Sequence, residues 1–275
     1  MENGESDAFQ GWTPRWYLWD GGFLALGRVN GVVPPHSHHA IQIALALDHT
    51  LRVQGPDDEW RDLRGAIVLP DVTHSFDGCD SFIAMLFVDP ECPEGRWLRD
   101  ALRNPVTAVP DARIDHCAGP LRQFVESPLE AMAAGELIHH TVRGLCAGAP
   151  PARRLDPRVT RALQFIRESD TTRLALDDVA AFVFLSPSRF AHLFSDHVGV
   201  PFRRYLLWRK LTRAMVAIGH GGTLTAAAHQ AGFSDSAHLT RTFYQMFGLP
   251  PSVMMGTAEF YEIPAPFELI GPTRT

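Results

Sequence analysis

Residues 231–243 read AGFSDSAHLTRTF, and residues 182–194 read FVFLSPSRFAHLF. The two stretches align at an offset of 49 residues, which places Phe194 against Phe243. In each stretch a helical pattern ends, a polar residue restarts a helix, and apolar residues then recur at helical spacing. Internal repetition of this kind predicts two copies of one supersecondary unit, and the pattern is that of a helix-turn-helix.

Start and stop signals give each unit its second helix. Ser186 before Pro187 is typical of an N-cap followed by the first helical position, and Gly199 with Pro201 ends that helix. The same glycine and proline recur 49 residues later. Residues 202–218 predict a long helix between the two units, and the glycines of residues 219–222 stop it.

The apolar stripe packs each second helix on its own unit, so its polar N-terminal end is left exposed and can enter a major groove. Base edges are read by short polar or basic side chains at that end. The candidates are Ser188, Arg189, Ala191, His192 and Ser195 in the first unit, and Ser236, Ala237, His238, Thr240 and Arg241 in the second. Candidate phosphate contacts are Arg203, Arg204, Arg209, Lys210 and Arg213.

Residues 174–252, through these paired motifs, resemble the DNA-binding domain of AraC/XylS-type bacterial transcription regulators. The resemblance implies two helix-turn-helix units on one long helix, with both recognition helices in successive major grooves of double-stranded DNA. It also implies RNA polymerase as a partner, a place in the bacterial cytoplasm at the nucleoid, and activation as the commoner outcome. Family base contacts carry over onto Ser188, Ala191, His192, Ser236, Ala237 and Arg241.

Charge divides the 275 residues in two. Residues 1–152 hold 11 Arg against 21 acidic residues, a net −10, and residues 153–263 hold 13 basic against 9 acidic residues, a net +4. The stretch 147–154 reads as a linker because it is small and Pro-containing. We therefore expect a domain over 1–152, a DNA-binding domain over 153–263 and a tail over 264–275.

No apolar run approaches the roughly 20 residues of a membrane span, and the acidic N-terminus has no signal-peptide pattern. Four widely spaced cysteines predict reduced thiols. These features favour a cytoplasmic protein with no membrane partner.

The front half predicts strands followed by helices. Short apolar or alternating runs, separated by turn residues, lie at residues 23–29, 41–47, 66–69 and 81–88. A helical pattern covers about residues 119–147. Strands at this spacing predict a small β-barrel or sandwich, and we expect a cupin-like barrel, with the helices as a dimerisation element of a homodimer.

Histidines gather around the second of these strands. His36, His38 and Gln42 share one parity in an extended chain, and His74 follows another strand. The pattern resembles the cupin metal motif in part, with Gln42 where that motif has Glu and a shorter turn before His74. Three interpretations stay open: a divalent transition metal on these four residues, a metal-free pocket for an organic ligand, and structural histidines. Ala44 and Ala46, by parity, leave room in the barrel.

The sequence thus predicts a DNA-binding transcription regulator controlled by a small molecule, with a ligand pocket of His36, His38, Gln42, Ala44 and His74. The alternatives are a metal-responsive regulator using the three histidines, a regulator without a ligand, and a metal cupin enzyme fused to a DNA-binding module. The enzyme is disfavoured because Gln42 and the shortened turn depart from the catalytic motif.

Overall fold

A computed structural model of the chain describes residues 13–145, 154–170 and 172–263. The chain divides into two compact units, which are taken separately below. The first unit is formed by residues 1–152 together with 244–275, and the second by residues 153–243. The expected tail, 264–275, and all but the last residue of the expected linker, 147–154, lie outside the described residues.

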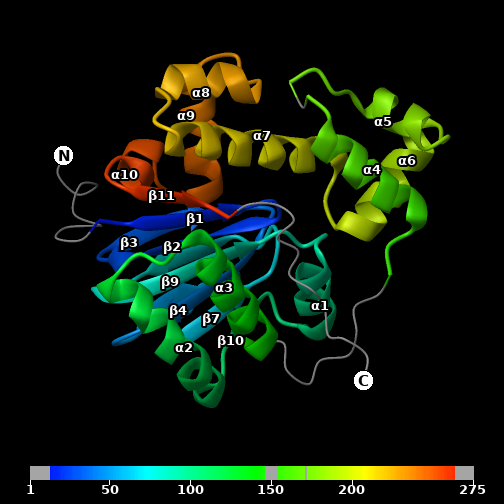
Figure 1. Ribbon diagram of the computed structural model, residues 1–275. Coiled ribbons are helices and arrows are strands. Elements are labelled where there is room, and N and C mark those ends of the chain that lie inside the picture. Colours follow the sequence, from blue (N-terminus) through cyan, green and yellow to red (C-terminus); the bar gives the residue numbers. More distant parts are fainter. Residues whose placement is uncertain (1–12, 146–153, 171, 264–275) are drawn as a thin grey trace. The chain divides into compact units, whose positions relative to one another are not determined.

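The first unit contains two β-sheets (Figure 1). The seven strands of the larger sheet are, in spatial order, β10 (Val106–Ala108), β7 (Gly65–Val68), β4 (Ile41–Ala46), β9 (Ser81–Val88), β2 (Gly22–Val29), β1 (Arg15–Trp19) and β11 (Glu259–Glu262). The four strands of the smaller sheet are β3 (Val32–His36), β8 (His74–Asp77), β5 (Leu51–Gln54) and β6 (Trp60–Leu63). All neighbours pair antiparallel except β1 and β11, which run parallel.

Side chains from both sheets form one hydrophobic core. Ala44 and Ala46 of β4 pack there with Val53 of β5 and Phe76 of β8, and all four are buried. The alternation of β4 explains this, because every second side chain points to one face of a strand. The strands were expected to form a barrel; they are joined instead in two separate hydrogen-bonded sheets, each with its own edges.

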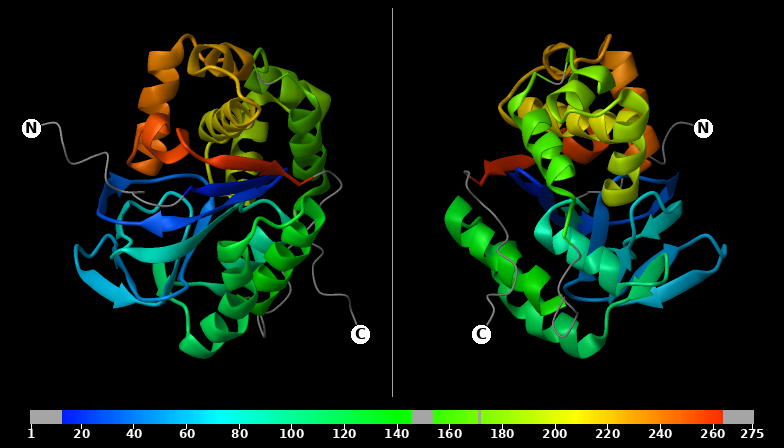
Figure 2. Two further views of the ribbon diagram at one scale, coloured as in Figure 1. Left: turned by 60° about the vertical axis from the view of Figure 1, so that its left-hand side comes forward. Right: turned by 90° about the vertical axis from the view of Figure 1, so that its right-hand side faces the viewer.

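Helices cover part of the first unit. They are α1 (Pro93–Ala101), α2 (Asp111–Glu126), α3 (Ala131–Leu145) and α10 (Pro251–Met255). The helices α2 and α3 pack side by side along one face of the larger sheet (Figure 1, and from other sides Figure 2). Ile114 of α2 lies beside Leu45 of β4 at Gly65, on the face of the sheet opposite the core. The helical region therefore starts earlier than the expected residue 119, and Pro120 lies inside α2.

The C-terminal strand belongs to the first unit. In β11, Glu259 pairs with Arg15 and Tyr261 stacks on Tyr17 with ring centroids 4.8 Å apart. The N–H of Ile263 donates to the carbonyl of Leu18 at 2.8 Å. Residues 153–263 were expected to form one domain, whereas residues 244–263 group with the sheets. The hydrogen bonds of β11 satisfy the free edge of β1.

The second unit is helical. Its elements are α4 (Pro157–Glu168), α5 (Leu176–Phe182), α6 (Pro187–Val198), α7 (Phe202–Gly219), α8 (Leu224–Ala231) and most of α9 (Ser236–Phe247). Phe190 and Phe194 of α6 pack with Val179 and Tyr205 in one core, and all four are fully buried. Among the described residues, no helix of the chain is long and apolar enough to cross a membrane.

The sequence repeat corresponds to a structural repeat. Ser186 accepts the N–H of Arg189 at the start of α6, and Asp235, 49 residues later, accepts the N–H of His238 at the start of α9. Gly199 after α6 and Gly248 after α9 are both left-handed, with φ of 92° and 73°. Only glycine adopts this conformation without strain, which is why the glycine recurs.

Phe184 in the turn between α5 and α6 combines a φ of 59° with a side chain that is 85% exposed. A bulky residue in this region is strained, whereas Asn tolerates it. We expect Phe184→Asn to raise the free energy of unfolding by about 1 kcal/mol, measured by urea denaturation. The control is Phe182→Asn at the end of α5. It removes an aromatic ring whose centroid is 4.2 Å from that of Phe165, and it is expected to lower the free energy of unfolding. Destabilisation by Phe184→Asn would contradict the assigned strain.

Candidate DNA-binding helices and histidine pocket

Capping hydrogen bonds hold the N-terminal ends of α6 and α9, and these ends are exposed. Pro187 occupies the first turn of α6 behind the Ser186 cap. Asp235 holds the backbone of α9 at 2.7 Å, and this hydrogen bond, followed by one from Ser234, lowers the pKa of its carboxyl group. Capping of this kind orders the first turn, so side chains there project from a rigid end.

The structure leaves most predicted base contacts accessible. Ser188, Arg189, His192, Ala237 and Arg241 are exposed, and Ala191, Ser236 and His238 are half-buried. His238 is already engaged, because its Nδ1 lies 3.2 Å from the Ser234 hydroxyl and its ring stands edge-on to Phe233. Arg241, by contrast, is one turn further along α9 and reaches solvent.

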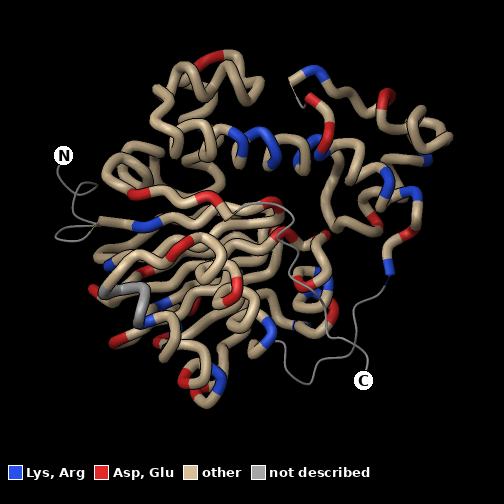
Figure 3. Tube along the Cα trace, viewed as in Figure 1, with Lys and Arg blue, Asp and Glu red and all other residues tan. Residues whose placement is uncertain are grey.

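Basic residues lie along α7 (Figure 3). Arg203 and Arg204 are exposed, and Arg209 and Lys210 are half-buried. The Nζ of Lys210 donates to the carbonyl of Gly232 at 3.1 Å, so this side chain closes the end of α8 inside the unit. By sequence, residues 153–243 hold 13 basic against 7 acidic residues, a net +6. A net positive helical unit suits a polyanion.

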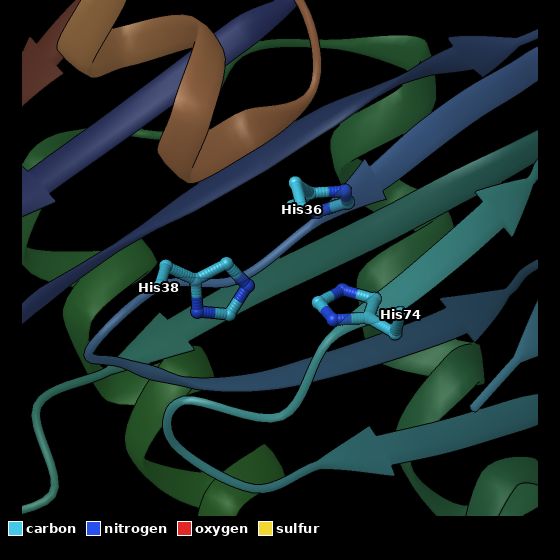
Figure 4. A group of neighbouring side chains, drawn as sticks. All are labelled: His36, His38 and His74. Atoms are coloured by element: carbon cyan, nitrogen blue, oxygen red, sulfur yellow. The ribbon is translucent and has the colours of Figure 1, made fainter. Parts of the chain in front are cut away.

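The first unit brings three histidines together. His36 ends β3, His74 begins β8 as its paired residue, and His38 lies on the connection to β4 (Figure 4). One ring nitrogen of each lies within 4.8 Å of the other two, and all three side chains are buried. The predicted grouping of His36, His38 and His74 is thus present, although the chain around His38 is not a strand.

Hydrogen bonds orient each of these rings. The Nδ1 atoms of His36, His38 and His74 lie 2.9, 2.9 and 3.0 Å from the carbonyl oxygens of Pro34, Ala40 and Val72. The Oε1 of Gln42 lies 3.0 Å from the Nε2 of His38 and 3.1 Å from that of His74. Gln42 therefore joins the cluster, as its parity with His38 predicted.

Burial keeps the cluster neutral. It is the largest cause that lowers the pKa of His36 to about 3, with a further contribution from His74. Burial also lowers the pKa of His38 and of His74. Neutral imidazoles are the form that binds metal ions.

A cavity of about 70 Å³ opens beside the cluster. That is room for about five water-sized groups. His36 and Gln42 contribute to its wall, and the rest is mostly apolar: Pro14, Trp16, Ala25, Leu26, Gly27, Val29, Val33, Phe76, Ile83, Met85, Phe87, Phe247, Leu249 and Met254. Ala44, predicted to line the pocket, lies in the core between the sheets instead.

Three of these wall residues come from the C-terminal stretch and were not predicted. Phe247 packs on Phe23 and Phe87, with ring centroids 6.0 and 5.6 Å apart. Next to it, a Cβ on Gly248 would lie 2.6 Å from Val33 and 3.1 Å from the Nδ1 of His36. Neither the composition nor the spacing of residues 247–254 signals this long-range packing.

His39 lies apart from the cluster. Its Nε2–H donates to the carboxylate of Glu91 at 2.9 Å, and both side chains are buried. Burial lowers the pKa of His39, but attraction to Glu91 and the hydrogen bond outweigh it, so the net effect is a raised pKa. Glu91 had no signal in the sequence, because it lies 52 residues away.

Comparison with known proteins concerns mainly the helical part. Residues 179–256 match the family described as "Helix-turn-helix domain". The regulatory protein PocR of Salmonella typhimurium is 28% identical over 97 residues, which are 35% of this chain and 32% of that protein. The transcriptional activator RhrA of Rhizobium meliloti is 32% identical over 81 residues, which are 28% and 26% of the two chains. Residues 179–256 thus form a helix-turn-helix domain of the AraC type.

The sequence similarity covers about a third or less of these curated relatives' length. The fold extends further. A structure of apo ToxT K231A from Vibrio cholerae shares it with a TM-score of 0.59 over 86% of this chain and 97% of that one, at 9% identity. Wild-type ToxT bound to an unsaturated fatty acid has a TM-score of 0.52 over 86% and 96%, at 11% identity. A sheet-rich region followed by a helical region with helix-turn-helix units is therefore common to both folds.

Proposed function

We propose that the chain is a sequence-specific regulator of transcription that binds double-stranded DNA through α6 and α9. The observation that carries this proposal is the repeated helix-turn-helix unit, in which both second helices are capped at an exposed N-terminal end. The excess of basic residues in the helical unit supports it. Arg241 is assigned to a base edge and Arg203 to a phosphate, since both are exposed.

Arg241→Ala is expected to weaken binding by about 1–3 kcal/mol and to relax specificity at one base position. The probe is a duplex selected by the wild-type chain from a random library, with titrations by fluorescence anisotropy on that duplex and on random DNA. The matched variant Arg203→Ala should weaken both duplexes alike and reduce the salt slope by about one. Equal losses on both duplexes for both variants would refute the assigned roles.

The effector is assigned to the cavity of the first unit. Its walls are apolar, two polar residues of the cluster reach it, and its size fits a small molecule rather than a long chain. Wild-type ToxT, which shares the fold, has been solved with an unsaturated fatty acid bound, and this supports control of the present chain by a small organic molecule. Control of transcription requires that this molecule bind two states of the protein with different affinity.

Self-association and contact with RNA polymerase are further parts of the proposal. The helices α2 and α3 carry exposed apolar surface at Met132, which is 61% exposed, and this supports their expected role in a homodimer. Activation of transcription and RNA polymerase as a partner rest on the resemblance of the helix-turn-helix part to AraC/XylS-type regulators alone. The alternative of a metal cupin enzyme shares the grouping of His36, His38 and His74, but Gln42 stands where the catalytic motif has Glu.

A further inference from the structure

We propose that His36, His38, His74 and Gln42 bind one first-row divalent transition metal, and that this ion holds a small anion in the adjacent cavity. This anion is the effector of the regulator, and that part of the inference rests on the proposed regulatory function. The metal site itself does not depend on it.

Backbone carbonyl groups fix the orientation of the three imidazole rings. A carbonyl oxygen only accepts hydrogen bonds, so the neutral rings of His36, His38 and His74 carry their proton on Nδ1, next to Pro34, Ala40 and Val72. The lone pair of each ring is then on Nε2. Metal-binding histidines have this arrangement, because a backbone carbonyl or carboxylate that accepts from one nitrogen fixes the other for the metal.

The side-chain oxygen of Gln42 lies next to two of the free ring nitrogens. Its Oε1 lies 3.0 and 3.1 Å from the Nε2 atoms of His38 and His74. With both protons on Nδ1, three lone pairs face one another with no proton between them. A cation relieves this repulsion. Ligands at right angles around an ion, with bonds of about 2.1 Å, are themselves about 3.0 Å apart.

The ligand set determines which kind of metal ion the site prefers. Three imidazoles and an amide oxygen, without a carboxylate or thiolate in the set, suit Zn²⁺, Ni²⁺, Co²⁺ or Fe²⁺ better than Mg²⁺ or Ca²⁺, which prefer oxygen ligands. A glutamine that replaces a carboxylate weakens the site but leaves the bound ion with its full double charge. The site therefore favours an additional anionic ligand.

The cavity defines that anion. His36 and Gln42 belong to its wall, so the metal would face it, and no Lys or Arg lines it in the described part of the chain. An anion in this apolar space needs the metal as its counter-charge, because an unpaired charge there is strongly disfavoured. With about 70 Å³ available, a small carboxylate with an apolar body fits.

One alternative uses the same atoms. If the Gln42 amide is turned over, its two N–H groups donate to the Nε2 atoms of His38 and His74, and the cluster is a hydrogen-bonded network without metal. As placed, the Nε2 of Gln42 is buried with no hydrogen-bond partner. Metal binding distinguishes the two arrangements.

The test is a titration of the full chain with Co²⁺ after treatment with a chelator. We expect one Co²⁺ per chain with visible d–d bands, and loss of these bands in His74→Ala and in His36→Gln. The matched control His116→Ala, an exposed histidine of α2, should keep them. Circular dichroism shows whether each variant is folded, and two variants guard against failure of one to fold. Gln42→Glu should tighten binding.

Acetate and benzoate are then added to the Co²⁺-loaded chain. A change in the d–d bands of the wild type supports the anion, and unchanged bands overturn that part. Absence of stoichiometric Co²⁺ in the folded wild type, or equal loss in His116→Ala and His74→Ala, overturns the metal site. No DNA is used, so a failure here is independent of whether the chain regulates transcription.

Discussion

Glu91→Leu is expected to lower the free energy of unfolding by about 3–5 kcal/mol near pH 6, because it leaves His39 buried without its charged partner. The two side chains are 0% and 1% exposed and join at 2.9 Å. They connect the segment before β4 to the segment before α1, which are distant in sequence. Urea denaturation followed by circular dichroism measures the loss.

A pH series separates the charge from the hydrogen bond. The pKa of His39 is raised in the folded state above its usual 6.5, so its ionic contribution is fully present below about 6.5 and is lost as pH rises through the folded-state value. Glu91→Gln keeps an oxygen acceptor but removes the charge. We therefore expect the stability gap between the wild type and Glu91→Gln to be largest at about pH 5–6.5 and to narrow above the raised pKa.

The control is Asp115→Asn, which removes a surface ion pair with Arg64 in which Asp115 is 63% exposed. It should change stability little at any pH, since exposed pairs are screened by solvent. The double variant His39→Leu with Glu91→Leu should recover part of the loss, because no unpaired imidazole remains. A Glu91→Leu chain as stable as the Asp115→Asn chain would show that the pair is dispensable.

The helical half was predictable because its signals are local. Ser186, Pro187 and Gly199 act on their own helix, and the 49-residue repeat made each unit a check on the other. The strands were equally visible where their alternation is regular, as in β4. Parity also placed Gln42 with His38, since it depends only on the backbone.

The remainder depends on long-range pairing, which the sequence does not encode locally. β11 has only four residues, and its assignment rests on pairing with β1, where Arg15 and Glu259 are 244 residues apart. The same holds for Phe247, Leu249 and Met254 on the cavity wall. Closure of the sheet was also unpredictable, because strand spacing alone does not tell a barrel from two sheets.

Phe247→Ala is the second large effect. The ring is 2% exposed and lies against Phe23, Phe87 and His38, so its removal leaves a hole in the first unit. We expect the free energy of unfolding to fall by about 3–5 kcal/mol. The matched control is Tyr244→Ala, an aromatic residue on the same helix that is 43% exposed, with an expected change under about 0.5 kcal/mol.

The same substitution tests the cavity. Because Phe247 forms part of its wall, the variant should enclose more apolar space than the present 70 Å³. Apolar holes of this kind stay dry and bind neutral ring compounds. Indole should therefore raise the melting temperature of Phe247→Ala but not of Tyr244→Ala. If indole stabilises neither variant, or if Phe247→Ala unfolds with the stability of the wild type, the C-terminal end of α9 does not close the cavity.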